Sequence, residues 1–185
     1  YSLATHPDPT LDAQLEALIE LVGAAQQPDG YLNTYFMFEN ADKRWTDLVT
    51  MHELYLGGHM IQAAVAHHRT TGRDNFLNIA QKWADHVCAR FGPGKHPGAP
   101  GHPEVEMALV ELYRETRDRK YLELANFFID QRGRGVLKGL ENLQDHLPIR
   151  EQTYMTGHAV RQLYLCCGVT DIFAEKGDKS LWSAL

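Results

Sequence analysis

The feature that most constrains this chain is a helical pattern that recurs, in which an apolar helix is followed by an amphipathic one. Its clearest copy begins with MHELYLGGHMIQAAVAHHRTTG, residues 51–72, which predicts a helix that is apolar on nearly every side and ends at Gly72. A helix of this kind is buried on more than one side. Residues 74–91 carry apolar side chains on one face only, which predicts a surface helix.

The same alternation returns twice farther along the chain. The further helices that we predict are 103–116 (buried type), 121–131 (surface type), 157–176 (buried type) and one that begins at residue 180. The connectors between paired helices resemble one another and read TGRDNFLNIA, TRDRKYLELA and KGDKSLWSAL. They begin at Thr71, Thr116 and Lys176, which are 45 and 60 residues apart. Repeats of this size that are built from helix pairs indicate stacked αα-hairpins, so we predict an all-α fold.

Alternating buried and surface helices predict an inner and an outer layer. The closed form of this arrangement is an (α/α)6 toroid, which takes about six helix pairs. The chain supplies roughly three pairs, together with an opening helix over 11–26 that Thr10 would cap. We therefore predict an incomplete toroid whose open edges expose apolar helix sides. We expect either that the chain is a piece of a longer protein or that it associates as a homo-oligomer.

Three segments outside the helices are predicted to be irregular. Residues 1–9 form a connector, 31–38 an aromatic loop with a brief strand, and 133–152 a polar loop. The aromatic side chains of the second loop either stack on a sugar or seat the loop as hydrophobic plugs, and plugs are the commoner use.

Charge and cysteine content exclude several classes of protein. The net charge of −6 argues against a nucleic-acid partner and against a basic membrane-binding patch. No apolar run approaches the ~18 residues that a membrane span requires. The three cysteines provide no disulfide framework, which favours a reducing compartment and hence a cytoplasmic location.

Each helix of the buried type is introduced by a histidine: His52, His102 and His158. Parallel inner helices would bring these imidazoles to one rim of the ring. Imidazoles together with carboxylates suit the recognition of a polyol, which needs both donors and acceptors. The acidic and amide residues close by in sequence are Glu53, Glu104, Glu106, Glu151 and Gln152. A single histidine would be read as a cap or a core residue, but three at equivalent positions favour a binding site. His67 and His68, at the opposite helix end, are predicted to be solvated partners of the helix dipole.

The sequence predicts no metal site. His52 does not begin a zinc-protease motif, because Leu56 stands where the second histidine would be. Cys166 and Cys167 are adjacent in a helix, so their side chains point about 100° apart and are poorly placed to share one ion. We predict that these two cysteines, like Cys88, pack in the core.

Several long motifs resemble glycoside hydrolase family 127, which includes the bacterial β-L-arabinofuranosidases. They are DGYLNTYF, RWTDLVTMHELYLGGHMIQAAVAHHRTTG, FGPGKHPGAPGHPEVEMALVELYRET, FFIDQRG, QDHLPIREQ and TGHAVRQLYL. The resemblance implies that residues 1–185 are about half of an (α/α)6-barrel catalytic domain, with the rest of the barrel and β-sandwich domains following. It also implies hydrolysis of terminal β-L-arabinofuranosyl groups with retention of configuration. His52, His102 and His158 match family histidines that contact the sugar.

The resemblance places the catalytic chemistry beyond this chain. In the family, the zinc-bound cysteine nucleophile, its companion ligands and the acid/base glutamate come later, so we expect no catalytic residue and no metal ligand within residues 1–185. Zinc would be a cofactor of the full-length enzyme only, and the segment would supply binding residues for an arabinofuranosyl saccharide. Two other classes stay open: an α/α-barrel sugar epimerase that uses histidines for proton transfer, and a non-catalytic helical-repeat scaffold.

Overall fold

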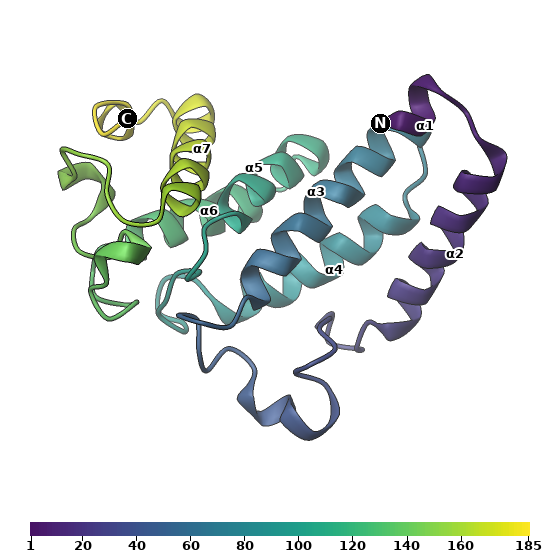
Figure 1. The fold of residues 1–185 in the computed structure, drawn as a ribbon, viewed down its shortest axis with the longest axis horizontal. Helices are drawn as coiled ribbons and strands as arrows, with labels where there is room; N and C mark the ends of the chain where they lie inside the picture. Colours follow the sequence, from purple (N-terminus) through teal and green to yellow (C-terminus); the bar gives the residue numbers. More distant parts are fainter.

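All 185 residues are described by a computed structural model, in which helices and their connecting loops form the whole chain (Figure 1). The long helices are α2 (Pro9–Ala25), α3 (Glu53–Thr71), α4 (Asn75–Arg90), α5 (Val105–Thr116), α6 (Arg119–Gln131) and α7 (Ala159–Lys176). The short ones are α1 (Ser2–Thr5), α8 (Lys179–Trp182) and the 3-10 turns η1 (Phe38–Lys43), η2 (Glu141–Leu143) and η3 (Ile149–Glu151). The brief strand expected in residues 31–38 does not form.

The helices are arranged in two layers, as the alternating pattern predicts. In the inner layer α3 packs against α5 and α5 against α7, while α4 and α6 each lie against the inner helix that precedes them. Helix α2 lies beside α4, and the hairpins follow one another in an arc from α2 to α7 (Figure 1). This architecture confirms an all-α fold and an incomplete portion of an α/α toroid.

Two adjacent glycines explain how closely α3 approaches its neighbours. A Cβ added at Gly57 would lie 1.9 Å from the Trp83 ring of α4. A Cβ added at Gly58 would lie 1.4 Å from a carboxyl oxygen of Glu104, which directly precedes α5. Glycine in a helix interior costs about 1 kcal/mol relative to alanine. Here that cost is offset because the missing side chains let two helices pack directly on α3.

Apolar side chains are exposed on α2 and α7 at the ends of the arc, as predicted for an open ring, and also on α3. Leu56 of α3 is 56% exposed, and Leu163 of α7 is 57% exposed. Leu18 and Leu21 of α2 and Val160 of α7 are also exposed. None of the helices combines the length and the apolar character needed to cross a membrane.

Several helix boundaries differ from the sequence-based prediction. The predicted connector 1–9 contains the short helix α1. Helix α2 is capped by Asp8 rather than by Thr10, because the Asp8 carboxylate accepts the N–H groups of Thr10 and Leu11. The helix expected to start at Pro103 starts at Val105, since the carboxylate of Glu106 accepts the backbone N–H of Glu104 at 3.0 Å.

Two predicted side-chain roles were wrong. His67 is buried rather than solvated, and its Nε2 lies 2.8 Å from Glu16 Oε1 of α2. It therefore links the opening helix to α3. Cys167 is exposed rather than packed in the core, because it lies on α7 at the open end of the arc, whereas Cys166 and Cys88 are partly buried.

Candidate functional site

The three histidines predicted from the repeat lie together at the N-terminal ends of α3, α5 and α7. The ring centroid of His102 is 6.1 Å from that of His52 and 6.3 Å from that of His158. His102 is half-buried between the other two, which are exposed. We call these three residues the rim cluster. The repeat thus predicts their proximity correctly, and their contact with a sugar stays a prediction.

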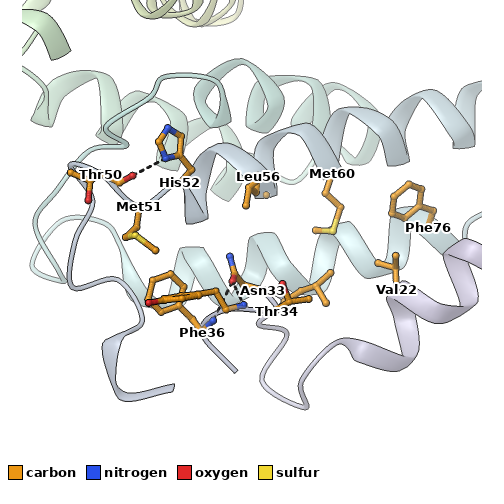
Figure 2. Close-up of a pocket in the computed structure, with 13 residues that line it drawn as sticks. Val22, Asn33, Thr34, Phe36, Thr50, Met51, His52, Leu56, Met60 and Phe76 are labelled. Atoms are coloured by element: carbon orange, nitrogen blue, oxygen red, sulfur yellow. Dashed lines mark hydrogen bonds between the residues drawn. The ribbon is translucent and has the colours of Figure 1, made fainter. Parts of the chain in front are cut away.

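Backbone groups orient each imidazole of the rim cluster. Nδ1 of His52 lies 2.8 Å from the Thr50 carbonyl (Figure 2), and Nδ1 of His102 lies 2.8 Å from the Pro103 carbonyl. A carbonyl can only accept, so these two Nδ1 atoms carry the proton, and in the neutral ring Nε2 is an acceptor. His158 is the opposite case, because its Nδ1 accepts a backbone N–H as the cap of α7 and leaves the proton on Nε2.

Electrostatics favour a neutral ring at the centre of the cluster. Burial lowers the pKa of His102, and charge on Arg161, His52 and His158 adds to this effect, against the hydrogen bond to the Pro103 carbonyl, which raises the pKa. With neutral rings the rim cluster presents acceptors at His52 and His102 and a donor at His158. This mixture matches a polyol, whose hydroxyl groups both donate and accept.

A second tier of rings lies beneath the rim cluster and consists of Tyr55, His59 and Tyr164. Tyr55 is 4.3 Å from His102 and 4.5 Å from His59, measured between ring centroids. Tyr164 of α7 is 5.5 Å from His102 and 6.3 Å from His59. These three residues were not predicted from the sequence to be part of the binding site. The available signal is spacing, because positions 52, 55 and 59 fall on one helix face.

The segment before α3 is anchored by a buried carboxylate. Glu53 accepts the backbone N–H of Trp45 at 2.8 Å and a short hydrogen bond from the hydroxyl of Tyr31. Burial raises the pKa of Glu53. Tyr31 and Phe36 are buried plugs, which is the commoner of the two predicted uses of this aromatic loop, whereas Tyr35 is exposed. The anchor fixes the chain that leads into His52.

A groove runs from the rim cluster along α3. Figure 2 shows His52 and Met51 at one end, the loop residue Asn33 facing Leu56, and Val22 and Phe76 at the other end. Most of its lining is apolar. The groove therefore offers an apolar surface beside the polar rim.

The carboxylates expected near the histidines are mostly structural. Glu106 is buried, and its Oε1 lies 3.5 Å from the fully buried guanidinium of Arg132. Arg132 also donates to the carbonyls of Leu143 and Pro100. Glu151 is exposed on η3, and Gln152 donates to the Leu147 carbonyl at 2.7 Å. These groups support the loops around the site and do not join the rim cluster.

Glu104 has the most unusual environment. It is fully buried, and neither carboxyl oxygen has a hydrogen-bond partner. Burial, followed by the negative charges of Glu106 and Glu111, raises its pKa to about 9. The carboxyl is therefore protonated at neutral pH.

This protonation makes stability depend on pH in a defined direction. Between the unfolded and folded pKa values of Glu104 the folded chain holds one proton more, so the free energy of unfolding falls as pH rises. For one proton, the free energy of unfolding can fall by at most about 1.4 kcal/mol per pH unit. As pH rises from 5 to 8, we expect the free energy of unfolding of the unchanged chain to fall by about 2 kcal/mol relative to that of Glu104→Gln. Urea unfolding at both pH values measures this difference.

A matched control replaces a carboxylate whose pKa moves in the opposite direction. Hydrogen bonds from Ser180 and Arg150 lower the pKa of Asp178 to about 2. Asp178 is therefore ionised throughout this range, and Asp178→Asn should show a stability difference that is constant between pH 5 and pH 8. A constant difference for Glu104→Gln would contradict a protonated Glu104.

The side chains present do not form a metal-binding set. No group of three or more histidine, cysteine, aspartate and glutamate side chains is arranged to hold an ion. Cys166 and Cys167 do not change this, because neither belongs to such a group. The zinc that the family resemblance implies is a cofactor of the full-length enzyme, and whether that enzyme holds it stays a prediction.

Comparison with known proteins gives consistent results. Residues 1–185 match the family of β-L-arabinofuranosidase, GH127 catalytic domains. The sequence is 41% identical to a non-reducing end β-L-arabinofuranosidase of Bifidobacterium longum subsp. longum, over 98% of this chain and 32% of the relative. The structure superposes on a GH127 β-L-arabinofuranosidase of Geobacillus stearothermophilus T6 with a TM-score of 0.92 and 44% identity, over 98% of this chain and 32% of that one. The structure also superposes on a second GH127 β-arabinofuranosidase with a TM-score of 0.93 and 43% sequence identity, over 100% of this chain and 30% of that one. The chain thus spans about a third of the length of these relatives.

Proposed function

This chain belongs to the β-L-arabinofuranosidase family with GH127 catalytic domains, and from that premise we propose that it is part of an enzyme that releases terminal β-L-arabinofuranose with retention of configuration. In this proposal the segment supplies sugar-binding residues, namely His52, His102 and His158. The observation that carries it is the convergence of the three imidazoles, in which the ring centroids of His52 and His158 lie 6.1 Å and 6.3 Å from that of His102. The names of the relatives support the class of sugar.

The rim cluster accounts physically for recognition of a furanose. Each buried sugar hydroxyl must keep a hydrogen-bond partner, because an unpaired polar group costs about 1–3 kcal/mol. Acceptors at His52 and His102 and a donor at His158 provide such partners in a fixed geometry. The rings of Tyr55 and Tyr164 supply apolar faces beneath them, against which the C–H side of a sugar can pack.

We assign bond cleavage to residues outside this chain. No catalytic residue is proposed within residues 1–185, and the zinc of the full-length enzyme would be held elsewhere in that enzyme. The rest of the enzyme would also cover the apolar helix sides at the ends of the arc, with association of copies as the alternative. A cytoplasmic location is proposed because Cys88, Cys166 and Cys167 are all free thiols.

Hydrolysis of an aryl β-L-arabinofuranoside tests the proposal. The full-length protein, supplied with zinc, is expected to release the aryl group, and residues 1–185 alone are expected to release none. The matched aryl α-L-arabinofuranoside should be a poor substrate. Sustained release by residues 1–185 would place the chemistry in this segment. Conversion of free L-arabinose to an epimer by the full-length protein would support an epimerase, and absence of sugar binding would support a scaffold.

A further inference from the structure

The buried carboxyl of Glu104 lies near the rim cluster but has no evident structural role. The side chain of Glu104 is fully enclosed where the loop enters α5, and both of its oxygens lack a hydrogen-bond partner. A buried carboxyl without a partner is costly, and such groups are concentrated at functional sites. Glu104 therefore needs an explanation beyond packing.

The polar atom that Glu104 faces belongs to His59. Nδ1 of His59 lies 3.6 Å from Oε1 of Glu104, just beyond hydrogen-bond length. Gly58 makes this approach possible, because a Cβ at that position would occupy the place of the carboxyl. The His59 side chain is 42% exposed and lies in the second tier, between Tyr55 and Tyr164. A small rotation of this imidazole closes the remaining gap, and such contacts are often long before substrate binds.

We propose that Glu104 is a positioning residue that donates a hydrogen bond to Nδ1 of His59 and so directs the Nε2–H of His59 toward a sugar hydroxyl. This proposal rests on the proposed function and extends it. His59 then becomes a fourth imidazole of the binding site, one level below the rim cluster. Its ligand is a hydroxyl of the bound furanose.

The surrounding charges favour a neutral donor at this position. Glu106 and Glu111, on the same helix, face Glu104 with negative charge, and Tyr55 and His59 face it from α3. The nearest buried cation, Arg132, is paired with Glu106 and is not in contact with Glu104. A protonated carboxyl has one O–H to give, and the lone pair of a neutral imidazole is a matching acceptor. The pKa of about 9 agrees with this state.

Kinetics of the full-length protein show whether Glu104 acts as a hydrogen-bond donor or has only a structural role. Glu104→Met keeps the volume but cannot donate, and His59→Phe keeps the ring but cannot bind a hydroxyl. We expect each to lower kcat/KM about tenfold, mainly through KM, as loss of one hydrogen bond predicts. The double variant should be no worse than either single one. Glu104→Gln can donate through its amide and should recover activity to within about threefold of the unchanged protein.

A control and a contrary outcome complete the kinetic test. Glu16→Gln alters another histidine–carboxylate pair, with His67, far from the rim cluster, and should leave kcat/KM unchanged. Thermal unfolding of every variant establishes that it is folded. Glu104→Met with unchanged kcat/KM, or a folded Glu104→Gln that is as impaired as Glu104→Met, would overturn the proposal.

The tautomer of His59 provides a readout that does not depend on hydrolysis. Nitrogen-15 NMR of histidine-labelled full-length protein should show the proton on Nε2 in the unchanged protein and in Glu104→Gln, and a shift toward Nδ1 in Glu104→Met. The same tautomer in all three proteins would refute the positioning role. A protein that shows the expected tautomers but hydrolyses no arabinofuranoside would refute the proposed function and leave the Glu104–His59 contact established.

Discussion

Replacing the three residues of the rim cluster together, as His52→Phe, His102→Phe and His158→Phe, is expected to lower kcat/KM of the full-length protein at least about a thousandfold. Phenylalanine keeps the ring contacts with Tyr55 and Tyr164 but can neither donate to nor accept from a sugar. Three lost hydrogen bonds of ordinary strength, each leaving a sugar hydroxyl unpaired, account for an effect of this size. Initial rates with an aryl β-L-arabinofuranoside measure it.

The control for this variant is a histidine on the same helix at its other end. His68 lies on α3 near Asp74 and Glu115, so His68→Phe should leave the rate unchanged. Binding of L-arabinose, followed by calorimetry, should be lost in the triple variant and retained in the control. Unchanged sugar binding in a folded triple variant would remove the rim cluster from the site and favour a scaffold.

The rim cluster was predictable because a histidine stands at or just before the start of each of the three inner helices. His52 and His158 are the N-caps of α3 and α7, and His102 lies two residues before Glu104, the N-cap of α5. Parallel packing of α3, α5 and α7 then brings equivalent positions together. Periodicity also gave the order of buried and surface helices. Each of these features depends on a pattern within one repeat, which can be read from a single sequence.

The second tier and Glu104 were not predictable in the same way. The start of α5 depends on Glu106 bonding the N–H of Glu104, and the burial of Glu104 depends on Gly58, 46 positions earlier. The sequence does carry a partial signal, since two adjacent glycines inside a helix suggest close approach of a neighbour. It does not say which neighbour approaches. His67 is a similar case, because its partner Glu16 lies 51 residues away.

The contact at Gly58 leads to the largest expected effect on stability. Gly58→Val should lower the free energy of unfolding by at least about 3 kcal/mol, as severe overpacking does. Its Cβ would meet the Glu104 carboxyl at 1.4 Å and the Val105 Cα at 2.9 Å. The second contact is with backbone, so relief requires α5 to move away from α3. Urea unfolding, followed through the buried Trp83, measures the loss.

Two further variants show whether the cause is the contact or the helix propensity of valine. Ala63→Val introduces the same side chain on α3 at an exposed position and should cost less than about 1 kcal/mol. Gly58→Ala combined with Glu104→Ala removes the carboxyl that the new Cβ would meet, so the double variant should lose less stability than the sum of the single variants. Strict additivity would show that Gly58 and Glu104 do not constrain each other. In that case the close packing of α3 on α5 would not be what holds Glu104 beside His59.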